Sequence, residues 1–239
     1  MLAVAVVIAV AGALYVAARE TSMFAVRDVV VTGAPKQIED RVRAALAPLL
    51  GKSLVGLSTH RVEALVDALP TVVSASADRD YPQTLRVAVR PERPVAVVRH
   101  LQDSWLVSER GRIMGQVPLG AMQGLPRIWL GQSVTGLAPG SVLLADQGGV
   151  AVRALSALPH PFPLAVWTAG GTPDAVTVTV RGPIQLRLGE AEDLRLKLRV
   201  AAAVLHSLTA EDLASMGYLD VSLPDRPVSG LKSQVESQA

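Results

Sequence analysis

The chain has 239 residues, half of them apolar, with a formal net charge of +2 and no cysteine. This length suffices for one large domain or two small ones with an ordinary packed core. The absence of cysteine excludes a disulfide framework, a thiolate metal site and a cysteine nucleophile. Basic residues are scattered among acidic ones and aromatic residues make up only 3%. A nucleic-acid binder needs a clustered basic face, so we expect no nucleic-acid partner.

The amino-terminal segment Met1–Ala18 contains no charged residue and ends at Arg19 and Glu20. As a helix it would be about 27 Å long, close to the ~30 Å hydrocarbon thickness of a bilayer. We interpret residues 1–18 as a single transmembrane helix that anchors an extracytoplasmic chain in the cell membrane. The alternative is a cleaved signal peptide, because Val16–Ala18 offers the small residues of a cleavage site. No basic residue precedes the segment in this sequence, so the sequence leaves the orientation of the anchor open.

Residues 23–91 show the pattern of a small mixed domain with the order β-α-α-β-β. Short β-branched runs indicate strands, and apolar residues at spacings of three and four indicate helices, with Ser58 or Thr59 as a helix cap. The predicted elements are a strand at Val26–Thr32, a helix from Pro35 towards Gly51, a helix from Ser58 to Pro70, and strands at Val72–Ala77 and Thr84–Val89.

Residues 92–224 are richer in strands. Alternation on both sides of Arg181-Gly182-Pro183 predicts a hairpin of 176–180 with 184–188. We expect a long helix with acidic residues in its first turn, where negative charge interacts favourably with the positive end of the helix dipole. The other predicted elements are strands at Val95–Val98, Trp105–Val107, Arg112–Val117, Arg127–Leu130 and Tyr218–Leu223, and helices at Gln147–Leu158 and Glu190–Leu208, the last beginning with Glu190, Glu192 and Asp193. The polar end, residues 225–239, is predicted to be a flexible tail.

The sequence offers no recognisable catalytic or metal-binding constellation. His60, His100, His160 and His206 lie far apart, and none has a histidine or carboxylate four residues on. Gly51-Lys52-Ser53 lacks the earlier glycine of a phosphate-binding loop, and no G-x-S-x-G occurs. We therefore predict no catalytic, metal or cofactor-binding residue and no small-molecule substrate. An exported enzyme whose acids converge from distant segments is the alternative.

Several short motifs occur in a characteristic order along nearly the whole chain. They are Phe24–Val29 with Val31-Thr32-Gly33, Gly51-Lys52-Ser53-Leu54, Leu69-Pro70-Thr71-Val72, Ala75-Ser76-Ala77, Tyr81-Pro82-x-Thr84-Leu85, Glu92–Ala96, Leu106-Val107 with Gly111, Leu219-Asp220-Val221 and Pro224-x-Arg226-Pro227. In this order they resemble the FtsQ/DivIB family of bacterial cell-division proteins. One departure is Ser108, which stands where the family usually carries an aspartate.

The resemblance implies an α+β chain with four parts: a transmembrane helix at 1–18, a POTRA domain at 23–91, a β-rich domain at 92–224 and the tail at 225–239. It also implies a non-enzymatic scaffold of the division septum that recruits and holds membrane proteins similar to FtsB and FtsL. The alternative function is that of another POTRA-bearing exported protein in envelope assembly or secretion. Such proteins usually carry several POTRA units or a transmembrane β-barrel, whereas this chain has one unit and too few residues.

The resemblance places the partner-binding site near the carboxyl end, on an edge strand at Tyr218–Asp225. An exposed edge offers unpaired N–H and C=O groups to an incoming strand. Leu223 falls where some family members carry an aromatic partner-binding residue. In the structural alternative, Leu219 and Val221 face the core and Tyr218 caps a helix–strand corner. The candidate partner-binding residues are Tyr218, Asp220, Ser222, Leu223 and Asp225.

Overall fold

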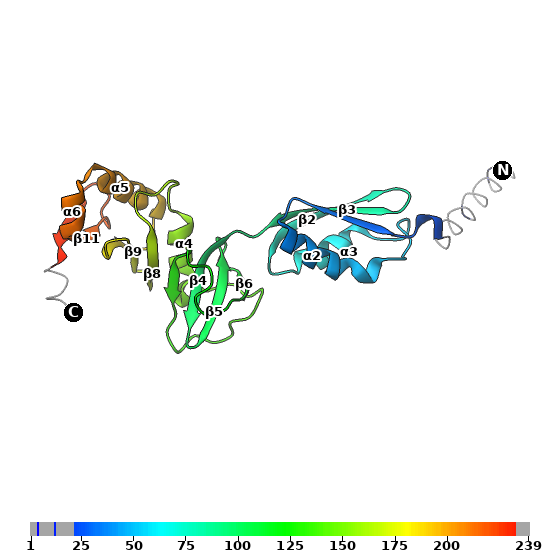
Figure 1. The fold of residues 1–239 in the computed structure, drawn as a ribbon, viewed down its shortest axis with the longest axis horizontal. Coiled ribbons are helices and arrows are strands. Elements are labelled where there is room, and N and C mark those ends of the chain that lie inside the picture. Colours follow the sequence, from blue (N-terminus) through cyan, green and yellow to red (C-terminus); the bar gives the residue numbers. More distant parts are fainter. Residues whose placement is uncertain (1–3, 5–11, 13–21, 233–239) are drawn as a thin grey trace. The chain divides into compact units, whose positions relative to one another are not determined.

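The computed structural model describes Val4, Gly12 and residues 22–232, which fall into two compact units divided between Glu92 and Arg93 (Figure 1). The predicted transmembrane helix at 1–18 lies outside the described residues, apart from Val4 and Gly12. Within the described part of the chain, no helix is both long enough and apolar enough to cross a membrane.

The first unit is a three-stranded sheet covered by two helices. Its strands are β1 (Asp28–Thr32), β2 (Val72–Asp80) and β3 (Thr84–Pro91), its helices are α2 (Lys36–Leu46) and α3 (Thr59–Asp67), and short 3₁₀ turns cover Ser22–Phe24 and Ala47–Leu49. The strand order is β1-β3-β2, with β1 parallel and β2 antiparallel to the central β3. The predicted β-α-α-β-β order is confirmed.

The core of the first unit follows from the helix and strand periodicities. Val42 and Leu46 of α2 and Val62 of α3 are fully buried, as are Leu85 and Val87, which alternate along β3. Each large apolar side chain removed from water in this way contributes about 1.5–3 kcal/mol. The cap predicted for α3 is present, because the Ser58 hydroxyl accepts a hydrogen bond from the Arg61 amide at 3.4 Å.

The second unit contains one sheet with nine strands in the described part of the chain. They are β4 (Pro94–His100), β5 (Asp103–Ser108), β6 (Ile113–Gln116), β7 (Arg127–Trp129), β8 (Val166–Thr172), β9 (Ala175–Val180), β10 (Ile184–Gly189), β11 (Met216–Asp220) and β12 (Val228–Leu231). Their order across the sheet is β12-β11-β10-β9-β8-β7-β4-β5-β6. The predicted hairpin is present as β9 and β10, with Val178 opposite Leu186 and both side chains fully buried.

Helices line the core side of this sheet: α4 (Gly149–Ser156) contacts β4, β8 and β9, and α5 (Leu194–Ser207) contacts β10. A short 3₁₀ turn (Ala145–Gln147) precedes α4, and α6 (Ala210–Ser215) leads directly into β11. The sequence prediction of a helix at 147–158 is therefore correct in kind and too long at both ends.

Two predictions of secondary structure in the second unit are wrong, and one strand was not predicted. The long helix begins at Leu194, because Gly189 and Asp193 adopt positive φ angles of 63° and 50° and reverse the chain. Glu190, Glu192 and Asp193 therefore precede the helix instead of forming its first turn. The strand β8 was not predicted. The tail expected at 225–239 is ordered in part, because residues 228–231 form β12.

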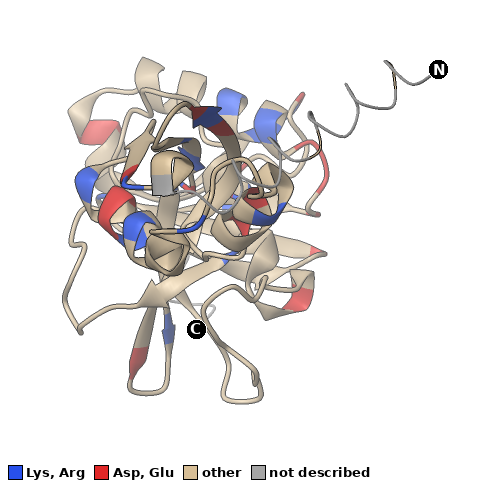
Figure 2. Cartoon of the chain, turned by 90° about the vertical axis from the view of Figure 1, so that its right-hand side faces the viewer, with Lys and Arg blue, Asp and Glu red and all other residues tan. Residues whose placement is uncertain are grey.

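Basic and acidic residues are interspersed along the ribbon (Figure 2), although α5 carries Arg195, Lys197 and Arg199 and no acidic residue. The described residues also contain no group of three or more His, Asp or Glu side chains arranged to hold a metal ion.

Candidate protein-interaction site

The strand β11 lies inside the sheet and is not its edge. It pairs in parallel with β10 on one side and antiparallel with β12 on the other. The close approach of β12 depends on Gly217, where an added Cβ would lie 2.8 Å from Lys232 Cα and 2.9 Å from Leu231 O. The prediction that Tyr218–Asp225 forms the exposed edge is therefore wrong, because a further short strand follows the turn.

The edge at this end of the sheet is β12. It is not paired on its outer side with another strand in the described part of the chain. Alternate residues of such a strand direct their N–H and C=O groups away from the sheet, which makes it a template for an incoming strand. Val228 is 55% and Leu231 53% exposed, so apolar side chains accompany this edge.

The opposite edge of the sheet, β6, is partly covered by the chain itself. The Ile113 amide donates to the Ser141 carbonyl at 2.8 Å, and the Gly140 amide donates to the Ile113 carbonyl at 2.8 Å. A segment that already occupies these backbone groups leaves β6 with less capacity to pair. Of the two edges, β12 is therefore the more open one.

Two of the predicted residues lie on β11 and point away from the core. Tyr218 and Asp220 alternate with Leu219, which is buried. The Arg187 guanidinium lies over the Tyr218 ring at 4.2 Å from its centre. Tyr218 thus packs against β10 and does not cap a helix–strand corner.

The remaining predicted residues lie in the connection between β11 and β12. The Asp220 carboxylate accepts hydrogen bonds from the Ser222 amide at 2.9 Å and hydroxyl at 2.6 Å, which shapes the start of this turn. Leu223 is 67% exposed, and its carbonyl accepts from the Arg226 amide at 3.0 Å. Asp225 is exposed as well. Asp220 and Ser222 therefore have structural partners, whereas Leu223 and Asp225 lie open to a partner.

Sequence reasoning missed Val228 and Leu231, two exposed apolar residues of β12 that lie three positions apart and therefore on opposite faces of the strand. Their only local signal is a valine and a leucine after Pro227, separated by a serine and a glycine. Four residues of this kind show no clear period, so the strand is defined by its pairing with β11 and not by its own composition.

The Asp212 carboxylate helps to fix where β11 begins, because it forms part of the cap of the preceding helix, α6. The Asp212 carboxylate accepts hydrogen bonds from the Thr209 hydroxyl at 2.7 Å and from the Thr209 amide at 3.1 Å, and the Thr209 hydroxyl accepts from the Asp212 amide. These bonds from Thr209, its side chain first and its backbone second, lower the pKa of Asp212 below its usual value. This capping box fixes the start of α6, whose last residue, Ser215, directly precedes β11.

Comparison with known proteins identifies the first unit. Residues 24–91 match the family described as "POTRA domain, FtsQ-type". The cell division protein FtsQ of Mycobacterium leprae is 38% identical over 85 residues, which are 36% of this chain and 24% of that protein. The chain thus spans about a quarter of the length of the curated relative that it matches.

Among solved structures, the chain is similar to the major extracytoplasmic domain of the bacterial cell division protein DivIB from Geobacillus stearothermophilus. The TM-score is 0.30 and the identity 18%, over 52% of this chain and 92% of that one.

Residues 24–91 therefore form a POTRA domain of the FtsQ type. The mixed α/β fold of the first unit agrees with this assignment.

Proposed function

We propose that this protein is a non-enzymatic scaffold of the division machinery, held in the cell membrane by residues 1–18 with its two units outside the cytoplasm. It recruits and holds septal membrane proteins similar to FtsB and FtsL. The similarity of residues 24–91 to FtsQ supports a role in cell division. The observation that carries the binding mechanism is the open edge strand β12, which follows the turn that bears the exposed Leu223.

Binding proceeds by strand addition to β12. A partner segment in extended form would pair with the outer backbone groups of this strand. Its side chains on one face of the sheet would lie beside Val228 and those on the other face beside Leu231, with Leu223 in the preceding turn. Exposed apolar side chains beside a free edge favour association, because each contact removes apolar surface from water. Tyr218, Asp220, Ser222 and Asp225 would border the same surface.

The test is a pull-down of the full chain in non-ionic detergent with a peptide of the carboxyl-terminal half of FtsB from the same cell. We expect saturable binding that Leu223→Glu weakens at least about tenfold, because a carboxylate would have to be buried without a partner. Leu223 is solvent-facing, so the thermal midpoint of unfolding should change little.

Leu119→Glu is the matched control, because Leu119 is also an exposed leucine, 57% accessible, in the loop that follows β6. It should bind the peptide as the wild type does. Equal binding of the peptide by the wild type and by Leu223→Glu would refute the assignment of Leu223. No saturable binding by the wild type would refute the proposed partner.

A further inference from the structure

The first unit contains a hollow of about 500 Å³ between the loop that follows α2 and the beginning of α3. Its floor is apolar and its rim carries two cations and two hydroxyl groups. The lining residues are Leu49, Leu57, Val62 and Leu65 on the floor and Lys52, Ser53, Ser58 and Arg61 around it, with Gly56 between them. No carboxylate lines the hollow, so its electrostatic character is positive.

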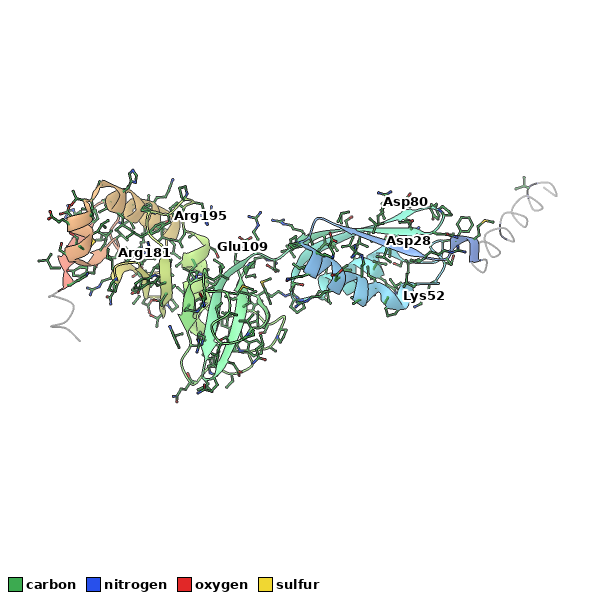
Figure 3. All side chains as sticks on the ribbon, viewed as in Figure 1. Asp28, Lys52, Asp80, Glu109, Arg181 and Arg195 are labelled. Atoms are coloured by element: carbon green, nitrogen blue, oxygen red, sulfur yellow. The ribbon has the colours of Figure 1, made fainter. Side chains whose placement is uncertain are left out.

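The two cations of the rim are available to a ligand. Lys52 and Arg61 are exposed, and neither has an ion-pair partner among the described residues. Figure 3 labels Lys52, which projects from the loop between α2 and α3. The amino end of α3, capped by Ser58, adds partial positive charge on the same side. Lys52 and Arg61 thus carry charge that no described acidic residue of the first unit neutralises.

The loop that bears Lys52 is held in place by hydrogen bonds on both sides. The Val26 amide donates to the Lys52 carbonyl at 2.9 Å, and the Leu54 amide donates to the Phe24 carbonyl at 2.8 Å. The Arg79 guanidinium donates to the Leu57 carbonyl at 2.6 Å. Because these bonds fix the rim in the absence of a ligand, binding would cost little ordering of the backbone.

The size and the apolar floor indicate what the ligand contains. Sites that hold a molecule of drug size measure about 300–1,000 Å³, so this hollow is larger than one carboxylate or phosphate needs. Leu65 is 49% exposed on the floor and would be covered by an apolar group. A fitting ligand therefore combines an apolar body with negative charge at its margins.

We propose that this hollow binds an acidic peptide segment of a partner protein, with an apolar side chain on the floor and carboxylates on Lys52 and Arg61. A membrane surface fits less well, since recognition of anionic lipids typically uses clusters of four to eight basic residues and the rim has two. The site is separate from β12, so its failure would leave the proposed scaffold function untouched.

The probe is a fluorescein-labelled peptide of alternating leucine and glutamate, titrated with the full chain in non-ionic detergent and followed by fluorescence anisotropy. Its glutamine counterpart serves as the uncharged probe. We expect saturable binding of the acidic peptide alone, weakened about tenfold by the double substitution Lys52→Gln, Arg61→Gln. The exposed pair Lys36→Gln, Arg41→Gln on α2 removes the same charge away from the hollow and should leave affinity within about twofold.

Equal losses in the two double variants would overturn the proposal, because binding would then depend on net charge and not on the hollow. Absence of binding to the acidic peptide would also overturn it. Co-sedimentation with vesicles of phosphatidylcholine and phosphatidylserine tests whether the hollow binds an anionic lipid surface instead of a peptide. If vesicle binding is lost in Lys52→Gln, Arg61→Gln while the peptide does not bind, the hollow contacts lipid and the peptide proposal is wrong.

Discussion

The side chains of Thr209 and Asp212 cap α6 and so help to position β11, the strand that pairs with the edge strand β12. Their reciprocal hydrogen bonds stabilise the charged form of Asp212 and lower its pKa. A group whose pKa is lower in the folded than in the unfolded state stabilises the fold above its unfolded pKa. This contribution is lost as the pH falls through the folded pKa, so the start of α6 should loosen in acid.

The corresponding prediction concerns Thr209→Ala. Removing the hydroxyl deletes the largest cause of the shift, so the pKa of Asp212 should rise towards its usual value. Carbon-detected NMR titration of the Asp212 carboxyl in both proteins measures this change. Identical titration curves would contradict the assigned cause. At the same scale, Leu223 differs from Asp220 and Ser222 because its side chain is apolar and exposed, whereas theirs are joined by a hydrogen bond.

At the scale of elements, β12 depends on a glycine in its neighbour. A side chain at position 217 would collide with the backbone of Leu231 and Lys232, which cannot turn aside as a flexible side chain would. We predict that Gly217→Val separates the end of β12 from β11. Amide hydrogen exchange should then accelerate in residues 228–231, while exchange in β9 and β10 stays as in the wild type. Unchanged protection of β12 would show that its pairing does not depend on Gly217.

Whether an element could be predicted from the sequence depended on how strong its own local period is. Elements with a strong local period, such as α3 and the β9–β10 hairpin, were predicted because burial of their own alternate residues determines them. The strands β8 and β12 were missed because glycine, serine and threonine blur the alternation, and their pairing partners lie outside the segment. The acids at 190–193 were misassigned because a reversal of the chain at Gly189 and Asp193 has no signature in the helix period.

The sequence analysis expected the edge strand at Tyr218–Asp225, whereas the edge at that end of the sheet is β12. Resemblance led to Tyr218–Asp225, and the structure makes Tyr218 and Asp220 part of an interior strand. Which strand is the edge depends on the order across the whole sheet, and this cannot be deduced from the composition of a single segment.

At the scale of the whole molecule, the two units present different surfaces for binding. The first unit, with its own core, offers a positively charged hollow at α3. The second offers the backbone of an edge strand beside exposed apolar side chains. A chain with two dissimilar sites can hold two partners at once, and linkage of such sites raises the effective concentration of each partner near the other.

The most direct test of the proposed scaffold mechanism is amide hydrogen exchange of the full chain with and without the carboxyl-terminal half of FtsB. We predict that exchange slows in β12, because outer backbone groups of this edge strand become paired. Exchange should stay unchanged in β6, residues 113–116, which serves as the internal control. Strand addition at β12 would be contradicted if saturating FtsB peptide added no protection at β12, or if it protected β6 instead.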